Sequence, residues 1–421
     1  MEHNKAVYFA EDNMGKRKLS KAARFERMFK IWEYLKNNTD KEHPTTQAQM
    51  RKVPEVSEFI GDKETFNRLI KDMARTMNSD EFGYKKEDDW KIYFHDFKKY
   101  FGDNAETYED EVDFGSDEEY EEFADQTMRI DGLYYNRTFT YDEINSIIEG
   151  ILSTKMLDTK SAAQLIEKVE QNLTTKFYKK GPKQICKVME PELADREQLS
   201  ANFLTIQRAI DNNVQISFRF NGYTYQKKLE PVREKKDTVS PYYIVASGGR
   251  YYLLACKEVV IKGEPVRNMS IWRIDLMTDI EIPEVNENLG MKGLPRIPKK
   301  DVENLPMEWT EDFQLKHLNM SYDKPIWITL KIKSPKLEDD PAKRIKVDYT
   351  FLHDWFGDQF RFVETEKTAS YNDIVKVECS PFAMVHWALQ YSDRVEVVAP
   401  EEIRNSVVEK IRNLNVKYGL E

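Results

Sequence analysis

Cysteines and long apolar runs are scarce in this sequence. Only three cysteines occur among 421 residues, and Cys186, Cys256 and Cys379 form no C-x-x-C spacing. This pattern argues against a disulfide framework and against a zinc site, so we expect three buried thiols and no bound metal. No stretch approaches the roughly 18 apolar residues that a membrane span needs, and the N-terminus lacks a signal peptide. We therefore expect a cytoplasmic protein without membrane contacts.

The motifs of the common enzyme classes are also missing. The sequence holds no G-x-S-x-G elbow, no P-loop, no glycine-rich dinucleotide fingerprint and no H-E-x-x-H, and its six histidines lie far apart. These motifs place a nucleophile, a phosphate or a metal at defined positions. We expect no enzymatic activity and no cofactor.

Charge is present in quantity but is unevenly distributed. The chain carries a net charge of -10, yet residues 15–77 hold 15 Lys and Arg against 9 Asp and Glu. Residues 101–128 hold 12 acidic residues and no basic one. A chain of this length exceeds one ordinary core, so we expect several domains. The first is a basic module, which is followed by an acidic connector.

Three helices are predicted in the basic module. Apolar residues recur at steps of three and four over residues 21–36, as in a helix with one buried face. Thr46 is a suitable N-cap for a short second helix that runs to about residue 52, ahead of Pro54. Asp62 is a suitable N-cap for a third helix from residue 63 to about 77.

Side chains suited to DNA are concentrated on the third helix. Basic side chains reach phosphates or guanine edges, Asn pairs with adenine, and Thr donates to phosphate. The candidate DNA-binding residues are Lys63, Thr65, Asn67, Arg68 and Lys71. A solvated surface helix would carry a similar set, so both interpretations stay open at this point.

The order of these helices resembles the winged helix-turn-helix of DeoR-type regulators. The segment KETFNRLIKD, residues 63–72, resembles the recognition helix of that family. The resemblance implies that this helix enters the major groove of double-stranded DNA. The aromatic segments 90–94 and 133–138 are predicted strands that could pair as the wing. The acidic residues between them then form an insertion, either solvated and partly disordered or acting as an electrostatic mimic of DNA.

A helical connector and a small β domain are predicted next. Thr140 and Glu143 form a capping box for a helix to Ser153, and a second helix spans residues 159–174. A helix at 199–212 then precedes a series of short strands, with Gly248-Gly249 as a hairpin turn. The predicted strands are 214–220, 227–232, 241–246, 251–256 and 269–276. This order favours a strongly bent sheet or a partial barrel.

The motifs in these strands resemble the WYL domain, which has an Sm-like barrel. They are I-x-F-x-F, L-E-P, S-P-Y, Y-Y-L at residues 251–253 and W-R-I-D at 272–275, followed by Leu276 where the family usually has Arg or Lys. The resemblance implies a ligand sensor with Ser240, Tyr242, Tyr251 and Arg273 in its pocket. Strand alternation adds Arg219 and Arg233 as basic neighbours. The alternative is that the tyrosines pack the barrel and that Arg273 pairs with Asp275.

In the stretch PFAMVHWALQYSDRVEVVAPEEIRNSVVEKI, residues 381–411, Trp387 precedes a predicted strand, a Pro and a last helix. This stretch resembles the C-terminal extension that accompanies WYL domains. Strands are predicted at 326–332, 345–347, 374–379 and 395–398, with helices at 381–390 and 401–414. The whole chain is thus predicted to be an α+β multidomain protein. Its predicted parts are a winged helix-turn-helix at 15–139 with an insertion at about 101–128, a helical connector at 140–198, a WYL sensor at 199–285 and a dimerisation domain at 307–421.

Two functions remain open on the sequence alone. The first is a DNA-binding transcriptional regulator that acts as a homodimer and senses a nucleotide or single-stranded nucleic-acid ligand, because Arg binds phosphate and Tyr stacks on bases. The second is a nucleic-acid-binding accessory or regulator of a CRISPR or phage-defence system.

Overall fold

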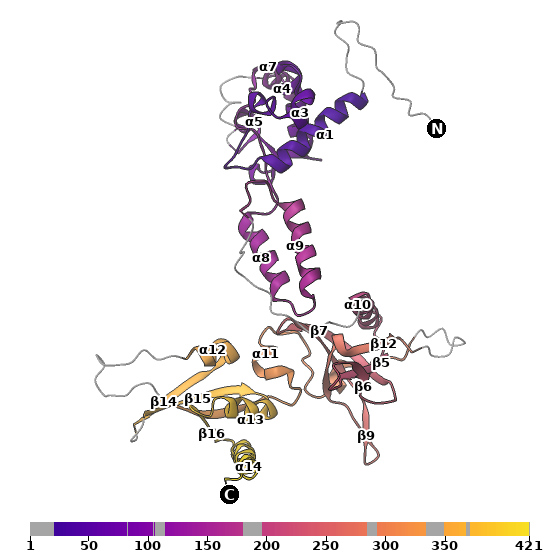
Figure 1. Ribbon diagram of the computed structural model, residues 1–421, viewed down its shortest axis with the longest axis vertical. Coiled ribbons are helices and arrows are strands. Elements are labelled where there is room, and N and C mark those ends of the chain that lie inside the picture. Colours follow the sequence, from indigo (N-terminus) through magenta and orange to yellow (C-terminus); the bar gives the residue numbers. More distant parts are fainter. Residues whose placement is uncertain are drawn as a thin grey trace. The chain divides into compact units, whose positions relative to one another are not determined.

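The computed structural model describes residues 21–81, 83–103, 105, 114–179, 196–283, 293–333, 349–367 and 371–420. The chain divides into two compact units (Figure 1). One unit comprises Met1–Ser153 and Thr159–Val188, and the other comprises Thr154–Asp158 and Met189–Glu421. None of the helices in the described ranges is long and apolar enough to cross a lipid bilayer.

The first unit begins as a helical domain around one apolar core. Its helices are α1 (Lys21–Asn38), α2 (Gln47–Met50), α3 (Pro54–Ile60), α4 (Lys63–Asn78), α5 (His95–Phe101) and α7 (Asp117–Thr127), with a 3-10 turn η1 (Glu87–Asp89). Thr46 caps α2 and Asp62 caps α4, as predicted, and Gln49 completes a capping box with Thr46. Helix α3 was not predicted: Pro54 stands at its first position, where the missing N–H is harmless, rather than ending a helix.

Two short strand pairs lie beside α4. They are β1 (Ser79–Asp80) with β2 (Gly83–Tyr84), and β3 (Ile92–Tyr93) with β4 (Tyr134–Tyr135). The predicted pairing of segments 90–94 and 133–138 is confirmed for these central residues. Buried Asn78 joins α4 to β3, because its Nδ2 donates to Ile92 O at 2.6 Å while its Oδ1 accepts from Lys91 N and Ile92 N.

Part of the acidic segment is an ordered helix packed on the core. Helix α7 begins after its N-cap Ser116, and its Tyr120 and Ala124 are buried with the aromatic core of the first unit. The expectation of a solvated, partly disordered insertion is therefore wrong for Asp117–Thr127, because apolar residues at a spacing of four anchor this helix. Residues 106–113 of the segment lie outside the described residues.

Two further helices complete the first unit. Helices α8 (Tyr141–Ser153) and α9 (Thr159–Leu173) lie side by side (Figure 1). The predicted capping box is confirmed, since Thr140 N donates to Glu143 Oε2 at 2.8 Å and Glu143 N donates to Thr140 Oγ1 at 3.3 Å.

A curled half-barrel sheet dominates the first part of the second unit. Its strands are β5 (Ile216–Tyr223), β6 (Leu229–Pro231), β7 (Asp237–Ser247), β8 (Arg250–Cys256), β11 (Met269–Arg273) and β12 (Met277–Glu281), in the order β11-β8-β7-β5-β12 with β6 beside β5. Strand β7 pairs with β5 through residues 237–239 and with β8 from Ser240 onward, so it bends between two neighbours. A 3-10 turn, η2 (Ile274–Leu276), joins β11 to β12.

Each face of this sheet is covered by a different segment. Helix α10 (Arg196–Asp211) packs on one face, where Phe218, Leu253 and Trp272 are buried. The segment from 297 to 320 packs on the other, where Tyr242, Leu254 and Cys256 are buried. This segment contains η4 (Lys299–Asp301), α11 (Phe313–Lys316) and η5 (Leu318–Met320).

The hairpin and thiol predictions are confirmed in part. Gly248 and Gly249 join β7 to β8 with φ of 54° and 77°, values that favour glycine. Cys256 and Cys379 are buried thiols, whereas Cys186 lies outside the described residues. The hairpin of β9 (Val259–Ile261) and β10 (Glu264–Val266) was not predicted.

The chain ends in a four-stranded antiparallel sheet. Its elements follow as β13 (Ile326–Lys333), α12 (Thr350–Phe356), η7 (Gly357–Gln359), β14 (Arg361–Lys367), β15 (Tyr371–Cys379), α13 (Pro381–Gln390), β16 (Val395–Ala399) and α14 (Glu401–Lys417). The strand order β14-β15-β13-β16 is that of a split βαβ sheet. The predicted strand at 345–347 lies outside the described residues, and the edge strand β14 was not predicted.

Candidate functional site

The start of α4 is fixed by a short, well-bonded turn after α3. Only Gly61 and Asp62 separate the two helices, and Gly61 has a φ of 65°. Asp62 accepts from Thr65 N at 2.7 Å and from Thr65 Oγ1 at 3.1 Å. These hydrogen bonds lower the pKa of Asp62, which keeps its carboxylate charged. The turn therefore sets the direction of α4 relative to α3.

The five candidate DNA-binding residues of α4 differ in exposure. Lys63 and Arg68 are exposed, whereas Thr65 and Asn67 are half-buried. The Thr65 hydroxyl already donates to Asp62. Lys71 is buried, with a relative exposure of 6%. The structure thus leaves Lys63 and Arg68 accessible and places Lys71 in a contact with another helix.

That contact joins α4 to the acidic helix α7. The Lys71 ammonium donates to the backbone carbonyl of Asp125 and lies 3.9 Å from Asp125 Oδ1. Arg75 Nη1 lies 3.0 Å from Asp125 Oδ2, and Arg75 Nη2 donates to Glu121 O at 3.3 Å. Burial lowers the pKa of Lys71, and the charge of Asp125 opposes that shift.

In the curled sheet, two arginines share one buried carboxylate. Arg273 donates from Nε to Asp275 Oδ1 at 3.2 Å and from Nη2 to Oδ2 at 2.5 Å. Arg250 Nη1 donates to the same Oδ2 at 3.3 Å. The pair of Arg273 with Asp275, one of the two alternatives from the sequence, is therefore present. Arg250 and Arg273 carry two positive charges and Asp275 carries one negative charge. One positive charge is therefore left uncompensated by this carboxylate.

Two tyrosines of the Y-Y-L motif lie on opposite faces of the sheet. Tyr252 is the register partner of Arg273. Tyr251 projects to the other face, where it makes an edge-to-face contact with Phe203 of α10 at 5.0 Å. Successive strand residues alternate between faces, so Tyr251 and Arg273 do not share a pocket. Tyr252, which was not among the predicted residues, takes the place expected for Tyr251.

The other predicted pocket residues lie in two separate groups. Ser240 and Tyr242 are buried and bind one backbone segment, since Ile297 N donates to Ser240 Oγ at 3.1 Å and Tyr242 Oη donates to Ile297 O at 2.7 Å. Burial raises the pKa of Tyr242 to about 12. Arg219 pairs with Asp279 and Arg233 pairs with Asp237. The six predicted residues are thus not gathered in one site.

A cavity of about 540 Å³ lies beside Arg250, one of the two arginines that bind Asp275. Arg250 and Tyr252 contribute to its wall, together with Lys155, Asp354 and Trp355. Lys155 belongs to the segment Thr154–Asp158. Its backbone N–H donates to Gly249 O of the β7–β8 hairpin at 2.9 Å. The cavity therefore combines cationic and aromatic side chains, which suits an anionic ligand with a planar group.

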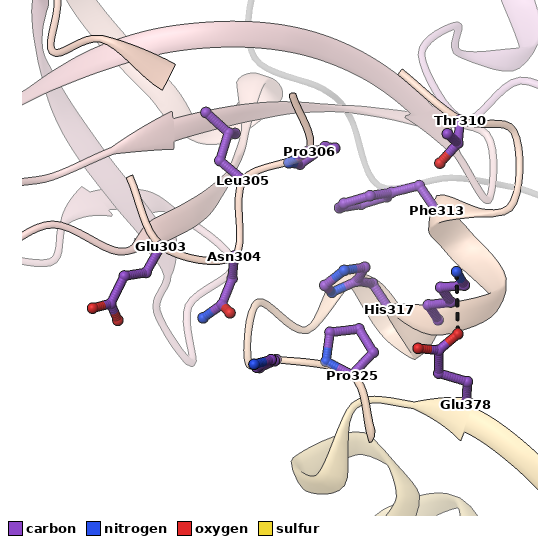
Figure 2. Close-up of a pocket in the computed structure, with 11 residues that line it drawn as sticks. Glu303, Asn304, Leu305, Pro306, Thr310, Phe313, His317, Pro325 and Glu378 are labelled. Carbon is purple, nitrogen blue, oxygen red and sulfur yellow. Dashed lines mark ion pairs between the residues drawn. The ribbon is translucent and has the colours of Figure 1, made fainter. Parts of the chain in front are cut away.

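A second cavity, of about 750 Å³, lies along the segment that follows the curled sheet. Figure 2 shows His317 in its wall between Phe313 and Pro325, with Glu378 at one side. Lys316 pairs with Glu378 at 3.2 Å and with Asp312 at 3.0 Å. The wall also holds Lys324 and Glu303, so its two lysines are balanced by two carboxylates, and this cavity is a weaker candidate for an anion.

Sequence reasoning missed Lys155, Arg250 and Tyr252. Strand alternation from the buried Trp272 could have separated Tyr252 from Tyr251. Nothing in the local sequence links Lys155 to Arg250, because they meet only through the fold. Within the described ranges, no group of three His, Cys, Asp or Glu side chains is placed to hold a metal ion.

Comparisons with known proteins give two similar solved structures and one family match. Two solved structures are similar at 12% identity over 94% of this chain. Proteasome accessory factor B/C of Arthrobacter aurescens is matched over 54% of its own length with a TM-score of 0.22, so the chain spans about half of that protein. A CRISPR Cas-related protein is matched over 92% of its length with a TM-score of 0.28.

No curated protein matches the chain. A family match falls on the curled sheet and on most of α10, where the motifs I-x-F-x-F, Y-Y-L and W-R-I-D also lie. Residues 201–282 form a WYL domain.

Proposed function

We propose that this chain is a DNA-binding transcriptional regulator whose WYL domain senses a nucleotide or a short nucleic-acid fragment. The proposal is carried by one observation: Arg68 is exposed on α4, and the Gly61-Asp62 turn sets the direction of this helix. The same chain also holds a WYL domain. In this proposal α3 and α4 are the helix-turn-helix, and β3 with β4 contributes to the wing.

On the DNA side, α4 supplies the residues that reach the duplex. Arg68 offers a planar fork for guanine or phosphate, and Lys63 offers a point charge near the helix start, where the helix dipole also favours an anion. Asn67 is half-buried and lies one turn after Lys63. Lys71 is left out of this direct contact, because it is buried against α7.

On the ligand side, Arg250, Arg273 and Tyr252 form the recognition group. The buried Asp275 holds both guanidinium groups in place, so little conformational entropy is lost when a phosphate binds. Tyr252 and Trp355 offer ring faces to a base from the wall of the same cavity. Lys155 adds a positive charge from the loop that joins α8 to α9, so that a bound anion would act on this loop.

A ligand changes DNA binding only if it has different affinities for two arrangements of the DNA-binding modules. We propose that the active form is a cytoplasmic homodimer, since helix-turn-helix proteins bind paired half-sites, and that it carries out no catalysis.

The test of the DNA contact is a gel-shift titration, at two salt concentrations, with the duplex that lies upstream of the gene encoding this protein. Arg68→Ala is expected to lose about 1–3 kcal/mol of binding free energy. Arg129→Ala is the matched control, because it removes another exposed arginine of the same unit. A protein that shifts single strands but no duplex would contradict the assignment of α4.

The test of the ligand contact uses Arg273→Ala with a short single-stranded oligonucleotide as the added probe. The variant is expected to bind duplex normally but to lose the response to the oligonucleotide. Arg267→Ala is the control, since Arg267 is another partly exposed arginine of the same domain and pairs with Glu258. An equal response in both variants would exclude Arg273 from the ligand site.

A further inference from the structure

Three basic residues of α4 follow one ridge of the helix. Arg68, Lys71 and Arg75 are separated by three and four positions, so their side chains leave the helix on the same side. Arg68 is exposed and takes part in no ion pair in the described part of the chain. Lys71 and Arg75 are covered by α7. One end of the ridge is therefore open and the other is occupied.

The group that occupies the ridge resembles a phosphate in its contacts. The Asp125 carboxylate lies 3.0 Å from Arg75 and 3.9 Å from Lys71, so one anion is shared by two cations. Such sharing is typical of a DNA phosphate between basic side chains. Asp125 keeps about half of its side chain exposed, which places this anion at the protein surface.

The contact leaves part of Arg75 unsatisfied. Its Nη1 and Nη2 donate to α7, but its Nε is buried and has no hydrogen-bond partner among the described residues. A buried N–H without a partner weakens the state in which it occurs. The other exposed carboxylates of α7, including Glu118, Glu121 and Glu122, add negative charge beside the ridge. DNA approaching Arg68 would meet this charge.

We propose that Arg68, Lys71 and Arg75 form one phosphate-binding ridge, and that Asp125 occupies its Lys71–Arg75 half as an internal competitor of the DNA backbone. The inference rests on the proposed DNA-binding role of α4. Tyr120 and Ala124 anchor α7 in the core, so the helix stays attached while its carboxylate holds the two cations. The affinity for duplex DNA is then low as long as Asp125 stays paired with Lys71 and Arg75.

The experiment measures duplex affinity over a range of salt concentrations for the full chain. Asp125→Asn removes the competing charge and keeps the size of the side chain. We expect about 3- to 10-fold tighter binding at low salt, because the charges of Lys71 and Arg75 are then no longer neutralised by Asp125, and each can add up to about 0.9 to the slope of log K against log salt. The gain should appear on unrelated duplexes as well, since phosphate contacts carry no sequence information.

Two further variants make the test specific. Asp117→Asn makes the same charge change in the first turn of α7, about two turns before Asp125, and it should give a much smaller gain. Arg75→Ala alone should leave affinity nearly unchanged, because Arg75 is already occupied. Combined with Asp125→Asn, it should remove most of the gain. Thermal unfolding of each variant checks that α7 remains packed.

The outcomes separate this inference from the proposed function. Equal gains for Asp125→Asn and Asp117→Asn would show general repulsion and overturn the inference alone. A clear loss of duplex binding in the single Arg75→Ala variant would also overturn it, because Arg75 would then already contact DNA. If neither the wild type nor Asp125→Asn binds any duplex, the proposed function fails, and the inference fails with it.

Discussion

Arg273 holds the buried carboxylate of Asp275 by two hydrogen bonds, at 3.2 and 2.5 Å. With Arg250 bound to the same carboxylate, the pair fixes the exit of strand β11 into the turn η2. The side chain of Asp275 keeps only 3% of its surface exposed. Its charge is thus compensated by protein groups, and the guanidinium groups depend on it for their position.

Asp275→Asn should therefore destabilise the fold. The amide keeps the shape but loses the charge-assisted hydrogen bonds, so we expect the free energy of unfolding to fall by about 1–3 kcal/mol. Asp279→Asn is the control, because Asp279 is largely exposed in its pair with Arg219 and should cost less than about 1 kcal/mol. Urea unfolding of the full chain measures both. Equal effects would mean that the arginine pair has no special role in stability.

Asn78→Ala should destabilise the first unit more strongly than an ordinary surface change. It would leave the N–H groups of Lys91 and Ile92 and the carbonyl of Ile92 without their partner. Each buried polar group that loses its hydrogen-bond partner lowers the free energy of unfolding by about 1–3 kcal/mol, and by less where water replaces the lost bond. Asn136→Ala removes a single exposed bond to Asp88 O and is the matched control. Thermal unfolding would contradict this account if the two variants lost the same stability.

His317 should make stability depend on pH. Burial lowers the pKa of His317 below its ordinary value of 6.5, and its Nδ1 lies 2.7 Å from Ser321 O. The unfolded chain then binds the proton at higher pH than the folded chain. Stability is complete above pH 6.5 and is lost as the pH falls toward the lowered pKa.

A His317→Gln variant should flatten this pH dependence below about pH 6.5, as measured by urea unfolding at several pH values. His353→Gln is the control, because it replaces a histidine that is about half exposed. An unchanged slope in His317→Gln would show that another group causes the dependence.

Lys155→Met should weaken the binding of a mononucleotide by about 3- to 10-fold, because a charged contact at a partly exposed site contributes about 1 kcal/mol. Trp355 lines the same cavity, so its fluorescence is a suitable signal for the titration. Lys160→Met, on the exposed surface of α9, is the matched control. If both variants bind alike, Lys155 does not contact the ligand.

The sequence predicted the elements whose signals are local. Asp62 and Thr140 mark their helix starts because a side-chain cap acts within three residues. Gly248-Gly249 marks its hairpin because the turn requires positive φ. Helix α3 was missed because Pro54 was taken as the end of a helix, although the same residue is also favourable at a first position.

The errors at the candidate site come from contacts distant in sequence. Lys71 and Asp125 are 54 residues apart, so composition alone could not show that the basic side chain is covered. Strand β14 was missed because it is an edge strand with exposed polar residues, which lacks a clear apolar alternation. Tyr251 was assigned by motif, whereas the alternation of β8 places Tyr252 beside Arg273.

The strand order of the last sheet determines when it can form during synthesis. Strand β13 lies between β15 and β16, so both of its neighbours are made well after it. The N-terminal unit and the WYL sheet can fold before Val395–Ala399, which form β16, have left the ribosome to pair with β13. A chain that stops before residue 395 would expose one edge of β13 as an unpaired strand, and such an edge invites aggregation.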